Sequence, residues 1–456
     1  MNVFLVPWLE LAILIPLFGA VAVRFVREVD TAYPLTLGCA GASLSAALAA
    51  WVGHSIGMTP AWQPQAWPSF RMDSLNAPLI PLIALLHVLT ILTTARVKQN
   101  RMSFTTHLFG ESIRLATFSC LEPWPLIVLL ALGILPPLLE MRRRNKSMRV
   151  FAIHMALFVV LLATGWFAVE RDWTIGPALL LAAVLVRSGT VPTHLWVADL
   201  FEHATFGTAL LFATPIVGMY VAVRLVIPVA PDWALSGIVI VSLVTAVLTA
   251  GVALVQTEAR RFFAYFLLSQ TSIVLIGLEI HSGNSTAGSL ALWLSLIVSL
   301  GGLGLILRSL EARFGLLTFR NHRGLYAGSP IFAVGFALFG LGSVGFPGTM
   351  GFIASEVLLD GAIENNVWIG LVMVSVAALN GIAVMRVYFL LFTGAVRTSS
   401  LDFSATVRER VAILILLGVL FGCGLVPELF IGNVRQPAGA KQQHEQVHRS
   451  SVPPSQ

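Results

Sequence analysis

The sequence predicts an all-α, polytopic membrane protein, and three observations support this fold class. Hydrophobic residues make up 57% of the 456 residues, charged residues make up only 11%, and the mean hydropathy is +0.86. A water-soluble surface needs far more charge than this. Apolar stretches of roughly 17–25 residues, each long enough to cross a bilayer as a helix, recur along nearly the whole chain. This pattern leaves no stretch for a soluble catalytic domain.

Counting these stretches predicts about 13 or 14 transmembrane helices, at roughly 20 residues each. The first one opens the chain, and its long apolar run without a basic start favours a spanning helix over a signal peptide. Residues 349–366 are expected to add a short or re-entrant segment. The predicted spans centre near residues 14, 43, 85, 128, 160, 183, 213, 243, 270, 298, 337, 378 and 418.

Three regions are expected along the chain. Residues 1–110 hold N-terminal transmembrane helices and a polar loop, and residues 111–435 form the main transmembrane core. Residues 436–456 are polar, contain prolines and lack periodicity, so we expect a disordered tail.

The polar loop is assigned to residues 95–115, where charged and hydroxyl side chains interrupt the apolar pattern. His107, Glu111 and Arg114 lie in this stretch. We expect them to form a solvated face between two spans, because charged side chains are rarely buried without partners.

Composition also excludes several kinds of chemistry. The formal net charge of +6 comes from short basic runs between apolar segments, such as Arg142–Arg144, which fits membrane topology rather than nucleic-acid binding. The cysteines Cys39, Cys120 and Cys423 are isolated and lack metal-site or disulfide spacing. No Rossmann or P-loop fingerprint occurs. We therefore expect no cofactor, no metal and no catalytic site in this chain.

A charged residue and a helix break stand together in one apolar span. Arg187 follows an apolar run, and burying a guanidinium at that depth costs a few kcal/mol unless it faces protein or water. Pro192 removes a backbone donor and disfavours helical geometry at Val191, so the helix should break there. Irregular backbone within a bilayer is tolerated where it lines a cavity. This pattern indicates an ion path, and the alternative is that Arg187 snorkels to a membrane surface.

The same stretch carries a recognisable spacing of polar residues. Arg187, Pro192, His194, Trp196 and Asp199 resemble a K-x4-P-x-H-x-W-x-P-D signature. That signature belongs to the proton-translocating membrane subunits shared by respiratory complex I and the multisubunit Na+/H+ antiporters. The resemblance implies an antiporter-like fold with two discontinuous helices in inverted repeats, and cation flux coupled to a larger complex.

Two residues of this signature differ from the family pattern. Arg187 stands for the usual lysine and Ala198 for the second proline. Arg187 keeps the positive charge but is effectively never deprotonated, so it cannot itself relay a proton. The resemblance makes Arg187, His194 and Asp199 candidates for an ion path, and Asp199 is one possible acidic partner of Arg187.

Two further segments also resemble this family. Residues 258–270 are similar to its charged-then-aromatic element, with the charged half at a membrane surface and the polar half packed inside. Residues 345–352 are similar to its second helix break, where Pro347 and Gly348 allow an unwound backbone. The resemblance covers roughly residues 65–432.

The remaining ion-path candidates are a histidine and two acids. His154 lies in an apolar span where relatives carry a lysine, so it is either a proton carrier or a packing residue bonded to a neighbouring helix. Glu356 and Asp360 follow the second break and share one face of a helix. They are either acids of a cation path or caps of the loop that ends at Asn366.

Three polar positions of the family are apolar in this chain. The glutamate expected five residues before Pro136 is Ala131, and two further stations correspond to Ile216 and Leu296. Titratable side chains therefore cannot continue the usual path through these positions. The chain either conducts a cation by a different route or no longer conducts.

Residues 345–361 and the short chain without a lateral C-terminal helix resemble the membrane subunit of an inorganic-carbon uptake system, whose partner is a zinc-containing, carbonic-anhydrase-like protein. Together with these losses, this resemblance leads us to favour an energy-coupling subunit of such a system. The alternatives are a proton-pumping subunit of an NADH:quinone oxidoreductase or related hydrogenase, and a non-conducting structural subunit. In each case the resemblance implies partner subunits in a bacterial inner membrane. The expected ion is H+, with Na+ as the alternative.

Overall fold

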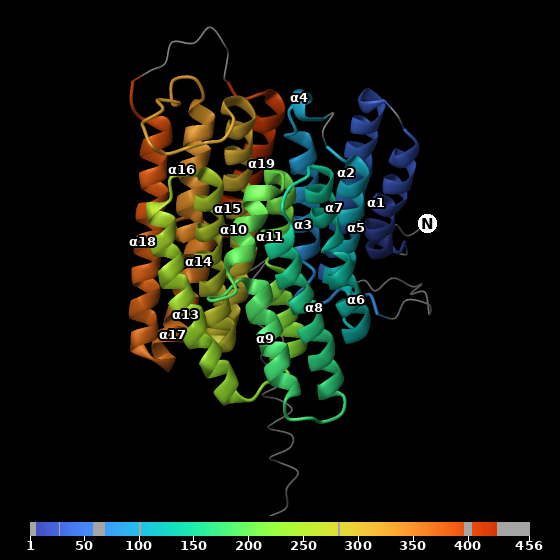
Figure 1. Cartoon of the computed structure of the whole chain (residues 1–456), viewed down its shortest axis with the longest axis vertical. Coiled ribbons are helices and arrows are strands. Elements are labelled where there is room, and N and C mark those ends of the chain that lie inside the picture. Colours follow the sequence, from blue (N-terminus) through green and yellow to red (C-terminus); the bar gives the residue numbers. More distant parts are fainter. Residues whose placement is uncertain are drawn as a thin grey trace, which may run out of the picture.

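A computed structural model describes the chain as a bundle of helices that run roughly side by side (Figure 1). The predicted tail at 436–456 lies outside the described residues. The structure describes residues 6–26, 28–57, 69–99, 102–280, 283–395 and 404–425.

Helices α1, α2 and α5 lie at one side of the bundle, and α13, α17 and α18 lie at the other (Figure 1). The helices are α1 (Trp8–Phe25), α2 (Val29–Ser55), α3 (Leu79–Leu92), α4 (Arg96–Gln99), α5 (Phe104–Ser119), α6 (Pro123–Leu132), α7 (Leu135–Arg143), α8 (Arg149–Val169), α9 (Gly176–Ser188), α10 (Leu195–His203), α11 (Phe206–Ala213), α12 (Val217–Val221), the π-helical η2 (Ala222–Val226), α13 (Asp232–Val255), α14 (Ala259–Glu279), α15 (Gly283–Phe314), α16 (Pro330–Val344), α17 (Met350–Asn365), α18 (Val367–Phe392) and α19 (Val407–Leu425).

The predicted fold class is confirmed. All thirteen predicted span centres fall within helices, and the extra segment expected at 349–366 is α17. Among the described residues, nine helices are long and apolar enough to cross a membrane, and α3, α9 and α16 are shorter apolar helices. The chain is therefore a multi-pass membrane protein.

Helix α15 is the central element of the bundle. It is 32 residues long, and its most apolar stretch is fully buried by the rest of the protein. Glycines and serines recur along it, and these small residues allow neighbouring helices to approach closely. Close packing matters here because helices in a membrane are not driven together by the hydrophobic effect. Helices α14, α16 and α17 all pack against it.

The close approach of α15 and α17 at Gly288 gives a first testable prediction. A Cβ atom at this position would lie 2.7 Å from Cα and 2.9 Å from Cβ of Leu358. We expect Gly288→Ala to destabilise the purified protein by about 1–3 kcal/mol, because overpacking forces the helices apart. Gly251→Ala on α13 is the matched control, since a methyl group there meets nothing within 4 Å. It should stabilise slightly, and equal effects of both changes on thermal unfolding would contradict the prediction.

The prediction of a solvated loop at 95–115 is wrong. Residues 104–119 form helix α5, with the Ser103 side chain accepting from Thr106 N at its start. The helix packs between α1, α2, α3 and α6. Its polar residues are buried, with Glu111 at 0% and Arg114 at 8% exposure. The guanidinium of Arg114 can be buried because it has a hydrogen-bond partner on α3. The charged residues of this stretch therefore belong to a buried cluster and not to a solvated surface.

Both predicted helix breaks are confirmed. Gly189 ends α9 with φ of 71°, before α10 begins at Leu195. Gly345 ends α16 with φ of 101°, and Gly348 has φ of 85° before α17 begins. These positive φ values favour glycine because a side chain would clash with the backbone.

Arg260 fastens the end of the first broken helix to the bundle. Its guanidinium donates to both carboxylate oxygens of Glu311 on α15 (2.7 Å each). It also donates to the carbonyls of Phe201 (2.7 Å) and Ala204 (2.9 Å) at the C-terminus of α10. One side chain of the 258–270 motif thus connects α10, α14 and α15, while Gln270 packs inside at 2% exposure.

Candidate functional site

Most backbone N–H groups in the break after α9 have hydrogen-bond partners. Thr190 N donates to Leu185 O (3.1 Å), and Val191 N donates across to Thr245 Oγ1 on α13 (3.0 Å). The peptide between Val191 and Pro192 is cis. Trp196 then folds back on α9, and its Nε1 donates to Val186 O (2.9 Å). The break is therefore a defined structure that bonds to α9 and α13, although Pro192 and Leu195 themselves are exposed.

Arg187 is buried beside this break. It is 6% exposed, and its NH2 donates to Phe212 O at 3.5 Å. The guanidinium carbon lies 4.4 Å from the ring centre of Phe212 and 5.3 Å from that of Trp196. Such cation–π contacts are stronger when desolvated. Among the described residues no carboxylate pairs with Arg187. The snorkelling alternative is excluded, because the guanidinium lies inside the protein.

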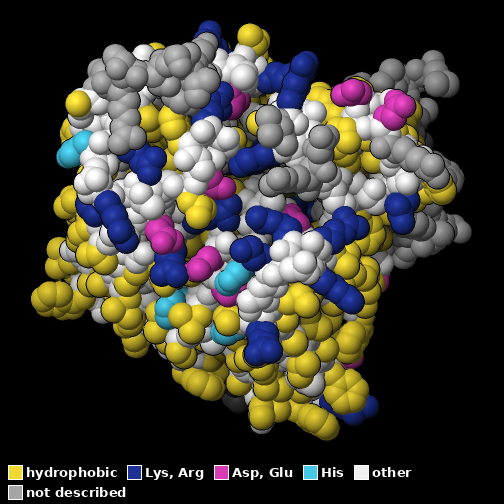
Figure 2. Space-filling view, turned by 45° about the horizontal axis from the view of Figure 1, so that its top comes forward, with side chains coloured by type: hydrophobic (Ala, Val, Ile, Leu, Met, Phe, Trp, Pro, Cys, Tyr) yellow, Lys and Arg dark blue, Asp and Glu magenta, His cyan; other side chains and the backbone are white. Residues whose placement is uncertain are grey.

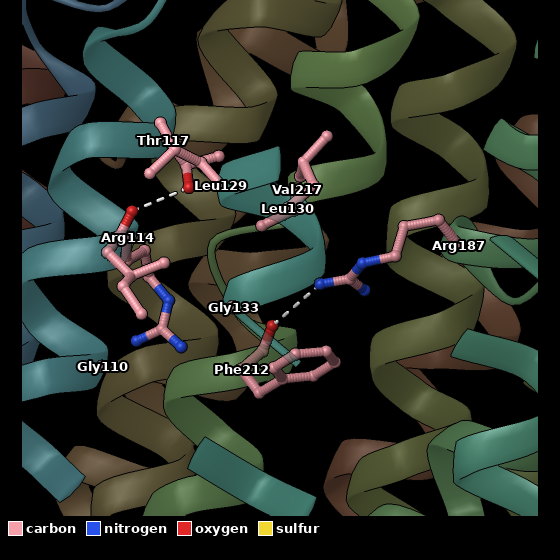
Figure 3. Close-up of a pocket in the computed structure, with 10 residues that line it drawn as sticks. Gly110, Arg114, Thr117, Leu129, Leu130, Gly133, Arg187, Phe212 and Val217 are labelled. Carbon is pink, nitrogen blue, oxygen red and sulfur yellow. Dashed lines mark hydrogen bonds between the residues drawn. The ribbon is translucent and has the colours of Figure 1, made fainter. Parts of the chain in front are cut away.

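Arg187 and Arg114 approach one small cavity from opposite sides (Figure 3). Its volume is about 30 Å³, which is enough for about two water molecules. No acidic residue lines it within the described part of the chain. The lining residues are Gly110, Ile113, Arg114, Thr117, Leu129, Leu130, Gly133, Arg187, Phe212 and Val217.

Arg114 is held by a histidine of α3 that the sequence analysis did not single out. Its NH1 donates to His87 Nε2 at 2.6 Å. Because a guanidinium has only donors, Nε2 must accept and the ring proton of His87 lies on Nδ1. Nδ1 is buried and has no hydrogen-bond partner among the described residues. The His107 ring centre lies 5.1 Å from that of His87, and its Nε2 is likewise buried without a partner.

Glu111 completes this group. Both of its carboxylate oxygens are buried, and neither has a hydrogen-bond partner among the described residues. The neighbouring Ser43 hydroxyl donates to Ala12 O (2.7 Å) instead. Arg114, one turn away on α5, is the nearby positive charge. We call His87, His107, Glu111 and Arg114 the α5 cluster.

The helical spacing of 107, 111 and 114 was a signal that could have revealed this cluster. Positions i, i+4 and i+7 share one face of a helix. A run of titratable residues on one face, followed by Thr117 at the cavity, fits a buried polar row equally well as a solvated surface. His87, alone in the apolar stretch 79–92, gave only a weak signal.

The α5 cluster leads toward a charged end of the bundle. Arg308 on α15 interacts electrostatically with His107 and donates to Thr90 O and Thr94 Oγ1, both at 2.7 Å. Lys98 of α4 and Glu311 lie near Arg308. Figure 2 shows charged side chains of both signs gathered at the centre of the face that Figure 1 draws uppermost, where α4 lies.

The other ion-path candidates Asp199, His194 and His154 form contacts that do not include Arg187. Asp199 Oδ1 pairs with His203 Nδ1 (3.1 Å), so Asp199 is not the partner of Arg187. His194 lies with its ring centre 6.3 Å from that of Tyr265, and its Nδ1 is buried without a partner among the described residues. His154 Nδ1 bonds to Val150 O of its own helix (2.8 Å). Their roles in an ion path stay predictions.

Glu356 and Asp360 occupy an exposed face of α17. They share that face, as their spacing predicts, but they do not approach Arg187. Their role in an ion path also stays a prediction. Pro347 and Gly348, predicted as helix breakers, lie in the turn between α16 and α17.

The apolar positions noted in the sequence do not carry a polar path. Leu296 is fully buried in α15. Ile216 lies between α11 and α12 with φ of 49°, and α12 continues into the π-helical η2. This third interruption was not predicted. It is buried, and π-helical turns often occur at functional positions.

The fold and the buried cation define a class: polytopic membrane proteins with a charged residue at a broken helix. Residues 127–380 match the family described as NADH:quinone oxidoreductase/Mrp antiporter, TM. That match covers more than half of the chain, and the chain belongs to this family.

Curated relatives include NADH-quinone oxidoreductase subunit N of Cupriavidus taiwanensis, 26% identical over 236 residues, which are 48% of this chain and 48% of that protein. Another is NADH-quinone oxidoreductase subunit N 1 of Chloroherpeton thalassium, 25% identical over 265 residues, or 56% and 55% of the two chains. The alignments span about half the length of these relatives.

Solved structures share the fold over nearly the whole chain. A chain of respiratory complex I from Thermus thermophilus with bound NADH superposes with a TM-score of 0.84 at 21% identity, covering 95% of this chain and 98% of that one. A chain of the Mrp complex from Dietzia sp. gives 0.81 at 17% identity, covering 95% and 97%. At these identities the likeness establishes the fold alone.

Proposed function

We propose that this chain is a proton-translocating membrane subunit of a multisubunit complex of the NADH:quinone oxidoreductase class, in a bacterial inner membrane. The observation that carries the proposal is Arg187, a buried guanidinium at a broken membrane helix beside a cavity of about 30 Å³. Buried charges within membrane segments mark ion paths because their desolvation cost is otherwise unexplained.

In this proposal Arg187 acts as a fixed positive charge. It cannot release a proton, so the moving proton belongs to water in the cavity and to titratable groups nearby. The guanidinium raises the free energy of a proton in the cavity and therefore acts as a barrier whose height depends on the charges around it. The redox chemistry belongs to partner subunits.

The relatives support the oxidoreductase over the inorganic-carbon system that we favoured on sequence alone. The two curated relatives described above are both oxidoreductase subunits. The preference for carbon uptake rested partly on the apolar residues Ala131, Ile216 and Leu296. The α5 cluster places other titratable groups in the interior, so these losses do not by themselves argue against a pump.

The test is to purify the tagged chain in mild detergent, identify its partners, and reconstitute the complex in liposomes with an internal pH-sensitive dye. We expect flavin and iron–sulfur subunits to co-purify, and NADH with a short-chain quinone to drive a pH change. A zinc-containing, carbonic-anhydrase-like partner without NADH oxidation would overturn the proposal. A complex that pumps the same number of protons per electron without this chain would instead indicate a structural subunit.

A further inference from the structure

Among the buried acids of the described residues, Glu111 lies nearest in sequence to the residues that line the cavity between Arg114 and Arg187. Arg114 is also its nearby positive charge. Gly110 and Arg114, its neighbours on α5, both line that cavity. Its carboxylate is fully buried, and neither oxygen has a hydrogen-bond partner among the described residues. A buried acid without hydrogen bonds is costly, so it needs a reason to be there.

We propose that Glu111 is the proton-carrying acid of this chain and that His107 supplies it from the charged end of the bundle. This inference rests on the proposed function and specifies its route. In this route an acid on α5 replaces the glutamate that the family resemblance would place at Ala131 on α6.

The first step of the route is a transfer along α5. His107 and Glu111 are four residues apart, so both lie on one face of the helix. His107 Nε2 and both carboxylate oxygens have unfilled hydrogen-bonding capacity. A proton leaves the protonated His107 ring, crosses a bridging water and binds a Glu111 oxygen, leaving a neutral ring and a neutral carboxyl group. Water-mediated bridges of this kind are nearly as favourable as direct hydrogen bonds.

The second step couples Glu111 to Arg187 through Arg114. While Glu111 is ionised, it compensates the charge of Arg114. When Glu111 takes up a proton, Arg114 and Arg187 face the same cavity without an acid, and their repulsion rises. His87 is the positioning residue, because its bond to Arg114 (2.6 Å) fixes the guanidinium at the cavity.

The test uses the reconstituted complex and Glu111→Gln, which keeps the size of the side chain but cannot titrate. We expect proton translocation to fall at least about tenfold, while the complex assembles and still oxidises NADH. His107→Gln should slow translocation as well. Glu122→Gln is the matched control, because Glu122 is an exposed carboxylate at the start of α6. Normal translocation by Glu111→Gln would overturn the proposal.

A measurement on the unmodified chain covers the case in which a variant fails to assemble. A hydrophobic carbodiimide reacts with protonated carboxyl groups in apolar surroundings, and mass spectrometry locates the adduct. We expect labelling of Glu111 to parallel the loss of translocation. Inhibition with Glu111 unlabelled would overturn the route. Loss of translocation in Arg187→Gln but not in Glu111→Gln would reject this route and leave the proposed function standing, whereas loss in neither would reject both.

Discussion

Replacing Arg187 with glutamine is expected to reduce proton translocation at least about tenfold, while Arg187→Lys retains most of it. The guanidinium is a fixed charge in the protein interior, with a carbonyl at 3.5 Å and two aromatic rings as its close partners. A unit charge about 8 Å from a moving proton raises its free energy by about 2 kcal/mol, which corresponds to roughly a 30-fold change in occupancy. Without this barrier, translocated protons leak back and net translocation falls. Lysine keeps that charge.

The measurement is the initial rate of dye response in reconstituted vesicles, normalised to NADH oxidation. Arg171→Gln is the matched control, because Arg171 also stacks on an aromatic ring, 3.7 Å from the centre of Phe167, but lies on the exposed surface. Full activity of Arg187→Gln, or equal losses in both variants, would show that the buried charge is not part of the ion path.

The largest loss of stability is expected for Glu409→Ala. Glu409 is 4% exposed, and its two oxygens accept from Arg313 at 2.7 and 2.6 Å. This pair joins α15 to α19, and Glu409 also accepts from Thr406 N at 2.8 Å. Removing the acid leaves a largely buried guanidinium without its partner, which typically costs about 3–5 kcal/mol. Thermal or denaturant unfolding of the purified chain measures this loss.

An exposed ion pair provides the comparison. Glu258 and Arg261 lie 3.7 Å apart with both side chains about half exposed. Glu258→Ala should therefore change stability by no more than about 1 kcal/mol. The double variant Arg313→Met with Glu409→Leu should recover much of the loss, because well-packed apolar residues can replace a buried pair. A Glu409→Ala protein as stable as Glu258→Ala would contradict the assignment.

The fold was largely predictable because a bilayer leaves few solutions for a chain this apolar. Every predicted span centre fell within a helix, and the breaks at Gly189 and Gly345 followed from proline and glycine chemistry. Helix α5 was missed because its polar residues lower the hydropathy of the stretch. Hydropathy cannot distinguish a polar loop from a helix whose polar face is turned toward other helices.

The site was only partly predictable. Arg187 was identified from its span and the motif around it, and the structure places it at a buried break. The contacts between Arg114 and His87 join residues 27 positions apart, so no local pattern could indicate them. Conversely, the sequence left Glu356 and Asp360 as either acids of a cation path or caps of a loop, and the structure places both on an exposed face of α17. Which face of a helix is buried depends on its neighbours and not on its own sequence.

The outward acids of α17 add a cost to inserting this helix into a membrane. Glu356 lies six residues beyond the start of α17, about 9 Å along the helix from the break. A carboxylate at the centre of a membrane-spanning helix costs about 2.5–3.5 kcal/mol on insertion scales. Protonation of Glu356, or a surface that covers it, removes this cost.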